Sequence, residues 1–300
     1  RFFVILLLPV FLFSVEVSGT VSGTWGVEDS PYLVVGDVLI TPYTSLAIDP
    51  GVEVLFMDDY ELRVEGELHA VGTEQDSIYF RSDGGDGATW QGISFQFSTG
   101  LSEISYAHFE HTSGPAVYSY YSNPINITSS VFGELSEEAL HFEDTFSDIT
   151  LTDLVIASGP NNSPAIRVDN SKISMYGLDI NGPANSDGIY YNSGYPLIAD
   201  NINVTDASIG LYLVASQNSE NLITNSQFAN SQRGVKMDAS FASFDNCYFN
   251  NNSSDGFMSE GHSGINISNS EVFANGANGI FFRNPQSSYY NINTTSVYNN

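Results

Sequence analysis

The sequence has 300 residues, of which 42% are hydrophobic, and this is enough apolar material to build a sizeable core. Its 8 Lys and Arg stand against 35 Asp and Glu, and the formal net charge of -27 disfavours binding to nucleic acid, anionic lipid or polyanionic sugars unless cations bridge the gap. The single cysteine, Cys247, excludes an intramolecular disulfide, so a secreted chain of this kind depends on packing and backbone pairing.

The N-terminal residues have the pattern of a secretory signal peptide, which we assign to residues 1–19. A basic first residue precedes an apolar run over residues 2–13, and residues 17–19 include the small side chains that a signal peptidase reads. The run is too short to span a bilayer comfortably, so we expect cleavage, secretion to the extracellular space or the cell surface, and no transmembrane segment afterwards. Residues 20–32 are expected to form a linker.

A repeat with a period in the low twenties then runs to the end of the chain, which predicts a solenoid. A Gly or Ala followed by an apolar residue recurs at intervals of 22 to 26 residues, at Gly92, Ala116, Ala139, Ala165, Gly188, Gly210, Gly234, Gly256 and Gly279. Counted from each of these anchors, the first and third residues are mainly apolar, whereas the second and fourth are mainly polar or aromatic. This is the alternation of a β-strand with one buried face.

A further strand-like segment follows in each coil, with apolar residues five positions apart, as in Ile127 and Phe132. In the coil that starts at Gly188 two pairs fit this pattern, Leu197/Ile202 and Val204/Ile209. Small residues such as Ser226, Cys247 and Ser270 lie between the apolar ends, each next to an Asn. We interpret Cys247 as a packing residue, because no His aligns with it, and we expect the Asn side chains to bond buried turn backbone.

The repeat resembles that of the right-handed parallel β-helices of the pectin-lyase-like superfamily. Gly279-Ile280 with Phe282, and the segment 267–272, carry the resemblance, and the stretch from Gly36 to Gly72 is similar to the opening coils of large secreted β-helix proteins. It implies an all-β fold with three strands per coil over residues 33–300, divided into opening coils at 33–91 and regular coils at 92–300. The chain starts with Arg and ends in a strand-like segment, so we interpret it as a fragment cut at both ends.

Enzymes of this superfamily usually have their site on the outward face of one strand stack, which here contains the second and fourth residues after each anchor. Neighbouring coils lie about 4.8 Å apart, so Glu143 is expected beside Asp169, and Asp238 beside Glu260. Such carboxylate pairs suit a glycosidase or a calcium site, or are simply a solvated acidic coat. The candidate catalytic residues are Glu143, Asp169, Arg167, Asp238, Glu260 and Lys236.

The same stack supplies candidate sugar-binding side chains, because aromatic faces pack well against sugar rings. They are Tyr118, Tyr120, His141, Tyr190 and Tyr212, although stacked aromatic residues also stabilise adjacent strands without any ligand. Calcium is the one cofactor that the sequence suggests, with Glu143 and Asp169, or Asp83 and Asp86 in a Gly-rich turn, as candidate ligands.

Two functions remain open. The first is a non-catalytic secreted or surface-attached β-helix that binds extracellular polysaccharide or acts as a rigid adhesion module or stalk. The alternative is a polysaccharide lyase or hydrolase. The ordered motifs of polygalacturonase-like hydrolases are missing, since Gly261-His262-Ser263 follows Arg233–Lys236 instead of preceding it. The short turns predicted by the even coil lengths leave little wall for a catalytic groove.

Overall fold

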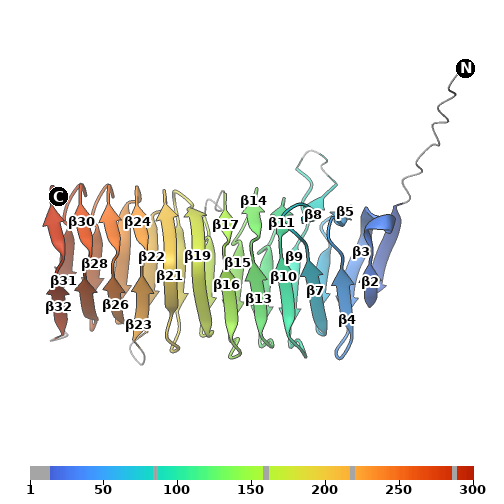
Figure 1. Ribbon diagram of the computed structural model, residues 1–300, viewed down its shortest axis with the longest axis horizontal. Coiled ribbons are helices and arrows are strands. Elements are labelled where there is room, and N and C mark those ends of the chain that lie inside the picture. The colour runs from blue at the N-terminus through green and yellow to red at the C-terminus, as the bar shows by residue number, and fades with distance from the viewer. Residues whose placement is uncertain (1–13, 84, 86, 158–161, 217–219, 286–288) are drawn as a thin grey trace, which may run out of the picture.

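The computed structural model describes residues 14–300 except positions 84, 86, 158–161, 217–219 and 286–288. The chain winds into an elongated right-handed parallel β-helix whose coils lie side by side along one axis (Figure 1). The one helical element among the described residues is a single 3-10 turn, Val27–Asp29. Within the same residues no helix is long and apolar enough to cross a membrane.

Each coil contributes strands to three parallel stacks, and apart from the first and last coils the strands pair with their counterparts in the coils before and after them. Stack A, which carries the candidate site, contains β6 (Glu61–Val64), β9 (Gly92–Gln96), β12 (Val117–Tyr120), β15 (Leu140–Glu143), β18 (Ile166–Asp169), β20 (Asp187–Asn192), β22 (Ile209–Val214), β25 (Arg233–Asp238), β28 (Phe257–Glu260) and β31 (Ile280–Arg283).

Stack B follows stack A in the chain. It contains β2 (Gly23–Trp25), β4 (Ser45–Ile48), β7 (Glu67–Val71), β10 (Ser102–Ser105), β13 (Ile125–Thr128), β16 (Ile149–Thr152), β23 (Asn221–Thr224), β26 (Phe241–Asp245), β29 (Gly264–Ser268) and β32 (Tyr290–Asn293).

Stack C closes each coil. It contains β5 (Glu53–Phe56), β8 (Ile78–Ser82), β11 (Ala107–Glu110), β14 (Val131–Gly133), β17 (Val155–Ile156), β24 (Gln227–Ala229), β27 (Tyr248–Asn250), β30 (Glu271–Phe273) and β33 (Ser296–Tyr298). Four longer strands pass from one stack into the next: β1 (Val15–Thr20) and β3 (Tyr32–Ile40) join stacks C and A, and β19 (Ile173–Asn181) and β21 (Ile198–Thr205) join stacks B and C.

The solenoid begins earlier than the predicted residue 33. Strand β1 pairs with β3, and β2 pairs with β4, so segments expected to lie in a signal peptide and a linker form the first coil. Cleavage after Gly19 would remove most of β1 from that coil. The apolar run at residues 2–13 lies outside the described residues, and the signal peptide stays a prediction.

The inward residues of stack A confirm the predicted alternation. Eight of the nine residues that follow the anchors are at most 1% exposed, namely Ile93, Val117, Leu140, Ile166, Ile189, Leu211, Val235 and Phe257, and the ninth, Ile280 in the last coil, is partly buried. The anchors are small because the coils approach closely there. A Cβ on Gly210 or Gly234 would lie 2.5 Å from the carbonyl oxygen of the next anchor, well inside van der Waals contact.

The predicted second strand is two short strands, one in stack B and one in stack C. A residue of positive φ, such as Ser129 or Asn225, separates them and turns the chain. Neither pair proposed for the coil at Gly188 is correct, because β21 aligns Ala199 and Val204 with the apolar ends of the neighbouring coils.

The hydrogen bonds that link the turns come from serines and from a second set of asparagines. Ser270 Oγ accepts the backbone N–H of Cys247 at 3.0 Å, whereas Asn225, predicted for this role, is exposed and uses its side chain on a surface carboxylate. Asn252, which is 1% exposed, accepts the Ser231 N–H and donates to the Phe228 carbonyl. Side chains of one turn thereby supply hydrogen-bond partners for buried backbone groups of the adjacent coil.

Candidate functional site

The predicted site residues of stack A lie together on the outward side of adjacent strands. We call the outward side chains of β9, β12, β15, β18, β20 and β22 the site face. Strand pairing sets Tyr118 beside His141, Glu143 beside Asp169, and Tyr190 beside Tyr212. All of these side chains are partly buried. Because they lie on adjacent strands, their polar atoms are close enough to pair with one another.

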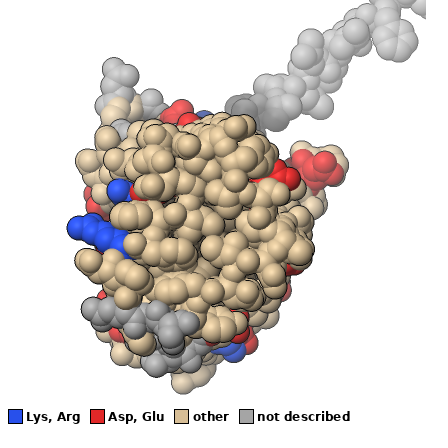
Figure 2. Space-filling view, turned by 90° about the vertical axis from the view of Figure 1, so that its left-hand side faces the viewer, with Lys and Arg blue, Asp and Glu red and all other residues tan. Residues whose placement is uncertain are grey.

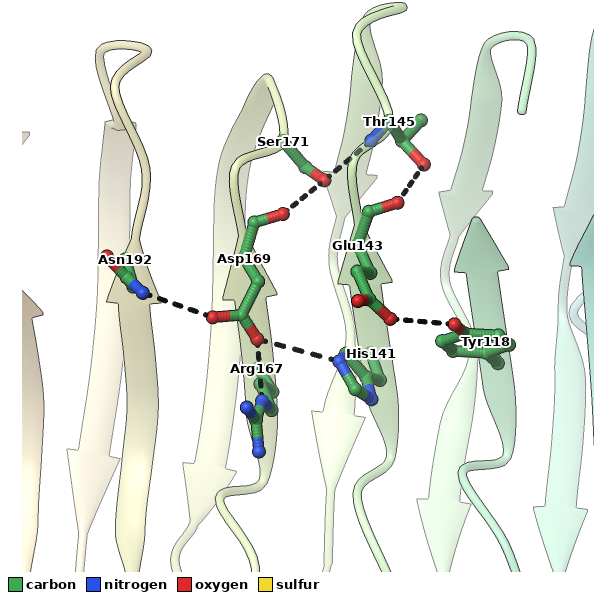
Figure 3. Close-up of polar contacts among 8 residues, drawn as sticks. All are labelled: Tyr118, His141, Glu143, Thr145, Arg167, Asp169, Ser171 and Asn192. Carbon is green, nitrogen blue, oxygen red and sulfur yellow. Dashed lines mark hydrogen bonds and ion pairs between the residues drawn. The ribbon is translucent and has the colours of Figure 1, made fainter. Parts of the chain in front are cut away.

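Tyr118, His141 and Glu143 form the first cluster of the site face (Figure 3). The Tyr118 hydroxyl donates to Glu143 Oε2 at 2.8 Å, and its ring meets the His141 ring edge-on with centroids 5.2 Å apart. Burial and the Glu143 carboxylate raise the pKa of Tyr118 well above its usual value. Tyr118 therefore stays protonated at neutral pH and acts as a hydrogen-bond donor rather than as a base.

Asp169 is the centre of a second cluster in the next coil. Its Oδ2 accepts Arg167 Nε at 2.6 Å and lies 3.6 Å from His141 Nε2, and its Oδ1 accepts Asn192 Nδ2 at 3.3 Å (Figure 3). Burial alone would raise the pKa of Asp169, but the contacts from His141 and Arg167 outweigh it and lower the pKa below its ordinary value. Ser171 Oγ donates to the Asp169 carbonyl and helps to fix the end of β18.

Cations cover two of the candidate tyrosine rings. The Arg167 guanidinium lies 5.7 Å from the centroid of Tyr190, and Lys236 Nζ lies 4.5 Å from that of Tyr212. The two rings also meet edge-on, 5.7 Å apart. These contacts stabilise adjacent strands, so the two tyrosines are less open to a ligand than the sequence suggests.

The second predicted carboxylate pair is arranged differently from the first. Lys236 Nζ lies 2.8 Å from Glu260 Oε1, and Arg283 Nη1 lies 3.7 Å from Glu260 Oε2. Both cations therefore pair with Glu260 and neither with Asp238. Hydrogen bonds to Glu260 and Tyr212 raise the pKa of Lys236 against the opposing effect of burial, so it stays charged.

The structure adds a hollow that the sequence did not predict, beside the first cluster. It encloses about 500 Å³ and is lined by Tyr118 and His141 together with polar residues of earlier coils, among them Asp59, Glu61 and Gln91. Gln91 Nε2 donates to the Asp59 carbonyl, which ties the two segments together. An adjacent Asp-Asp pair in the opening coils was the only sign of this wall in the sequence.

Asp187 is a further candidate residue that the sequence did not indicate. It precedes an anchor glycine on β20, and burial raises its pKa to about 6, with a smaller opposing effect from Lys236. Cys247 is fully buried, and burial raises the pKa of its thiol to about 12, which agrees with its interpretation as a packing residue.

Two of the predicted calcium ligands, Glu143 and Asp169, are register neighbours on β15 and β18. Across the described residues, no three His, Cys, Asp or Glu side chains are placed to hold a metal ion together. Asp83 Oδ1 accepts the Gly85 N–H, whereas Asp86 lies outside the described residues. Glu143 and Asp169 are engaged by Tyr118, Arg167 and their neighbours. Calcium binding stays a prediction.

Comparisons with known proteins agree with the fold. Residues 187–300 match the family model described as a right handed beta helix region. The match covers the C-terminal coils and agrees with the fold of the structure. The comparison with curated proteins finds no match.

Solved structures match this β-helix over most of its length. The A-module of the Azotobacter vinelandii mannuronan C-5 epimerase AlgE4 superposes with a TM-score of 0.63 at 13% identity, covering 95% of this chain and 86% of that one. The periplasmic alginate epimerase AlgG gives a TM-score of 0.64 at 14% identity, covering 93% and 84%. At these identities the likeness shows the fold alone.

Proposed function

We propose that this β-helix works outside the cytoplasm and binds polysaccharide along the site face, without changing the chain that it holds. The observation that carries the proposal is the hollow beside Tyr118 and His141, which continues into a row of half-buried aromatic, amide and carboxylate groups. Carbohydrate sites combine aromatic faces with hydrogen-bonding groups of fixed geometry. A stalk would need only the packed coils and leaves this row unexplained.

The structural neighbours support a polysaccharide as the ligand. Both are described as epimerases, one of mannuronan and one of alginate, and both share the fold of this chain. A long polymer suits a solenoid because the site face extends over several coils at intervals of about 4.8 Å.

The state of the ionisable groups favours binding over catalysis. Tyr118 keeps its proton, Asp169 is held ionised, and Arg167 is committed to Asp169. A hydrolase needs one carboxyl that holds a proton near neutral pH, and a general base needs a pKa close to the working pH. Asp169 is neither, and Asp187, whose pKa burial raises to about 6, belongs to neither of the two clusters. The first cluster supplies hydrogen-bond donors and acceptors in fixed positions instead.

One observation favours the alternative, a polysaccharide lyase or hydrolase. His141 Nε2 is buried and makes no hydrogen bond in the structure, and it lies at the hollow between Tyr118 and Asp169. A group in this position is able to exchange a proton with a bound sugar.

The experiment is a binding panel of soluble polysaccharides run by affinity electrophoresis, together with assays for new reducing ends and for unsaturated products. We expect binding without product. His141→Gln should weaken binding, whereas His108→Gln, on the outward side of stack C, should bind as the parent does. Product formation that His141→Gln abolishes would establish the enzyme instead, and the absence of binding to every polymer would refute the proposal.

A further inference from the structure

A strip of aromatic rings, three of them exposed and two partly buried, runs along the end of stack A and the turn to stack B. We call Phe97, Tyr120, Tyr121, Phe146 and Tyr195 the aromatic ladder. Phe97 and Tyr121 stack with centroids 5.9 Å apart, Tyr120 and Phe146 each meet Tyr121 edge-on, and Phe146 lies 6.3 Å from Tyr195. The ladder spans four coil steps, or about 19 Å along the helix axis.

Two exposed residues of the ladder, Phe97 and Tyr121, occupy a position where the backbone conformation favours small residues. The fifth residue after an anchor takes a positive φ in eight of the nine coils, and in six of them it is Asp, Asn, Ala or Gly, at Asp144, Asn170, Ala215, Ala239, Gly261 and Asn284. In the other two it is Phe97, with φ 53° and 59% exposed, and Tyr121, with φ 47° and 43% exposed.

Bulky side chains rarely adopt this left-handed conformation, and it costs about 1–2 kcal/mol for each residue. Exposed rings recover little of that cost by burial. Two strained, solvent-facing aromatic residues in adjacent coils therefore point to a ligand that covers them.

The charges of the protein indicate which class of ligand is compatible with the ladder. The chain has 8 Lys and Arg, of which Arg1 lies outside the described residues, and each of the other seven pairs with a carboxylate. The pairs are Arg63–Glu65, Arg81–Glu53, Arg167–Asp169, Lys172–Asp148, Arg233–Asp255, Lys236–Glu260 and Arg283–Glu260.

A protein of net charge -27 would repel a polymer of uronic acids. All seven of these cations are already paired with carboxylates of the protein. Figure 2 views the molecule at its C-terminal end and shows few charged side chains, which lie around the rim. An uncharged sugar avoids the repulsion and still gains from aromatic contact. The same net charge opposes close association of two copies of this chain.

We propose that the aromatic ladder binds a neutral polysaccharide that lies parallel to the helix axis, with sugar rings against Phe97, Tyr121 and Phe146. The inference rests on the proposed function and deepens it, because it names the class of polymer and the edge of the site face that holds it. It also separates this chain from its structural neighbours, whose descriptions name alginate and mannuronan, which are acidic polymers.

The test compares neutral and acidic polymers on the intact protein. Native gels containing laminarin, xyloglucan, galactomannan or arabinoxylan are run beside gels containing polymannuronate or polygalacturonate, with chelator present to remove bridging cations. Tyr121→Ala is compared with Tyr248→Ala, which removes a ring of nearly equal exposure, 43% against 41%, from stack C. Thermal melts and light scattering report the folding and the oligomeric state of each variant.

We expect at least one neutral polymer to retard the parent, Tyr121→Ala to lose tenfold or more in affinity, and Tyr248→Ala to bind like the parent. Equal or tighter binding of an acidic polymer, or unchanged binding by a folded Tyr121→Ala, would overturn the inference and leave the proposed function standing. A dimer that depends on Tyr121, formed without any glycan binding, would identify a second copy of the chain as the occupant. Binding of no polymer would refute both proposals.

Discussion

Asp169→Asn removes the charge at the centre of the site face and keeps the shape of the side chain. The carboxylate is 21% exposed and accepts Arg167 Nε at 2.6 Å. A hydrogen bond between charged groups contributes about 1.5–3 kcal/mol, and an exposed ion pair about 0.2–1 kcal/mol. Because Arg167 is 42% exposed, we expect the substitution to lower the free energy of unfolding by about 1–2 kcal/mol at neutral pH.

The loss should depend on pH in a defined direction. The pKa of Asp169 is lower in the folded than in the unfolded protein. Its contribution to stability is therefore complete above its unfolded pKa of about 3.9, and it disappears as the pH falls through the folded value. The difference between the parent and Asp169→Asn should shrink toward zero in strong acid.

Urea unfolding at about pH 7 and at about pH 2.5 measures both effects. Asp148→Asn is the matched control, because Asp148 also pairs with one cation, Lys172, but is 72% exposed. We expect it to change stability by less than about 0.5 kcal/mol. Equal stability of Asp169→Asn and the parent at neutral pH, or a difference that is the same at both pH values, would contradict this description of the cluster.

Three further predictions concern the scaffold. Asn252→Ala should lower the free energy of unfolding by about 2–5 kcal/mol, since two buried backbone groups lose their hydrogen-bond partner. Ser253→Ala in the same turn should change it little. Equal melting temperatures of the two variants would contradict the turn network. Cys247 should resist alkylation at about pH 8 in the folded protein and react after unfolding, because burial raises its pKa to about 12; rapid labelling of the folded protein would show an accessible thiolate. Gly234→Val should lower the free energy of unfolding by about 3 kcal/mol or more, because the added Cβ would lie 2.5 Å from a carbonyl oxygen. Gly194→Val should cost less, because a Cβ there has no atom within 4 Å. Similar urea midpoints for the two variants would refute the close approach at Gly234.

The fold was predictable because each coil repeats the same constraint. Ile189 and Leu211 lie one coil apart and must both face the core, so a period of 22 residues is visible without any structure. The exact strand ends were less visible. In β21, for example, a residue of positive φ, Asn201, lets one continuous segment serve two stacks, and apolar spacing alone does not locate that bend.

The membership of the site face was also predictable, but the partners within it were not. Coil spacing brings Glu143 to Asp169, and the structure confirms that register. Which acid a cation selects depends on side-chain rotamers, and so Lys236 pairs with Glu260 rather than with Asp238. The hollow was not predictable, because Asp59 in its wall belongs to an opening coil whose repeat is irregular.

The aromatic ladder was invisible for a different reason. Only the backbone angles show that Phe97 and Tyr121 adopt a left-handed conformation, which bulky side chains rarely take. A sequence pattern records that an aromatic residue is present, but not that the backbone conformation disfavours it.

Oxidative footprinting of the tyrosines tests the central claim, that a polysaccharide covers the site face, most directly. The native protein is exposed to hydroxyl radicals with and without the polymer that the binding panel selects, and the modified peptides are quantified. We predict protection of Tyr118, Tyr121 and Tyr190, and no protection of Tyr79 and Tyr248, which lie on stack C. Protection confined to Tyr79 and Tyr248, or equal at all five, would contradict the claim.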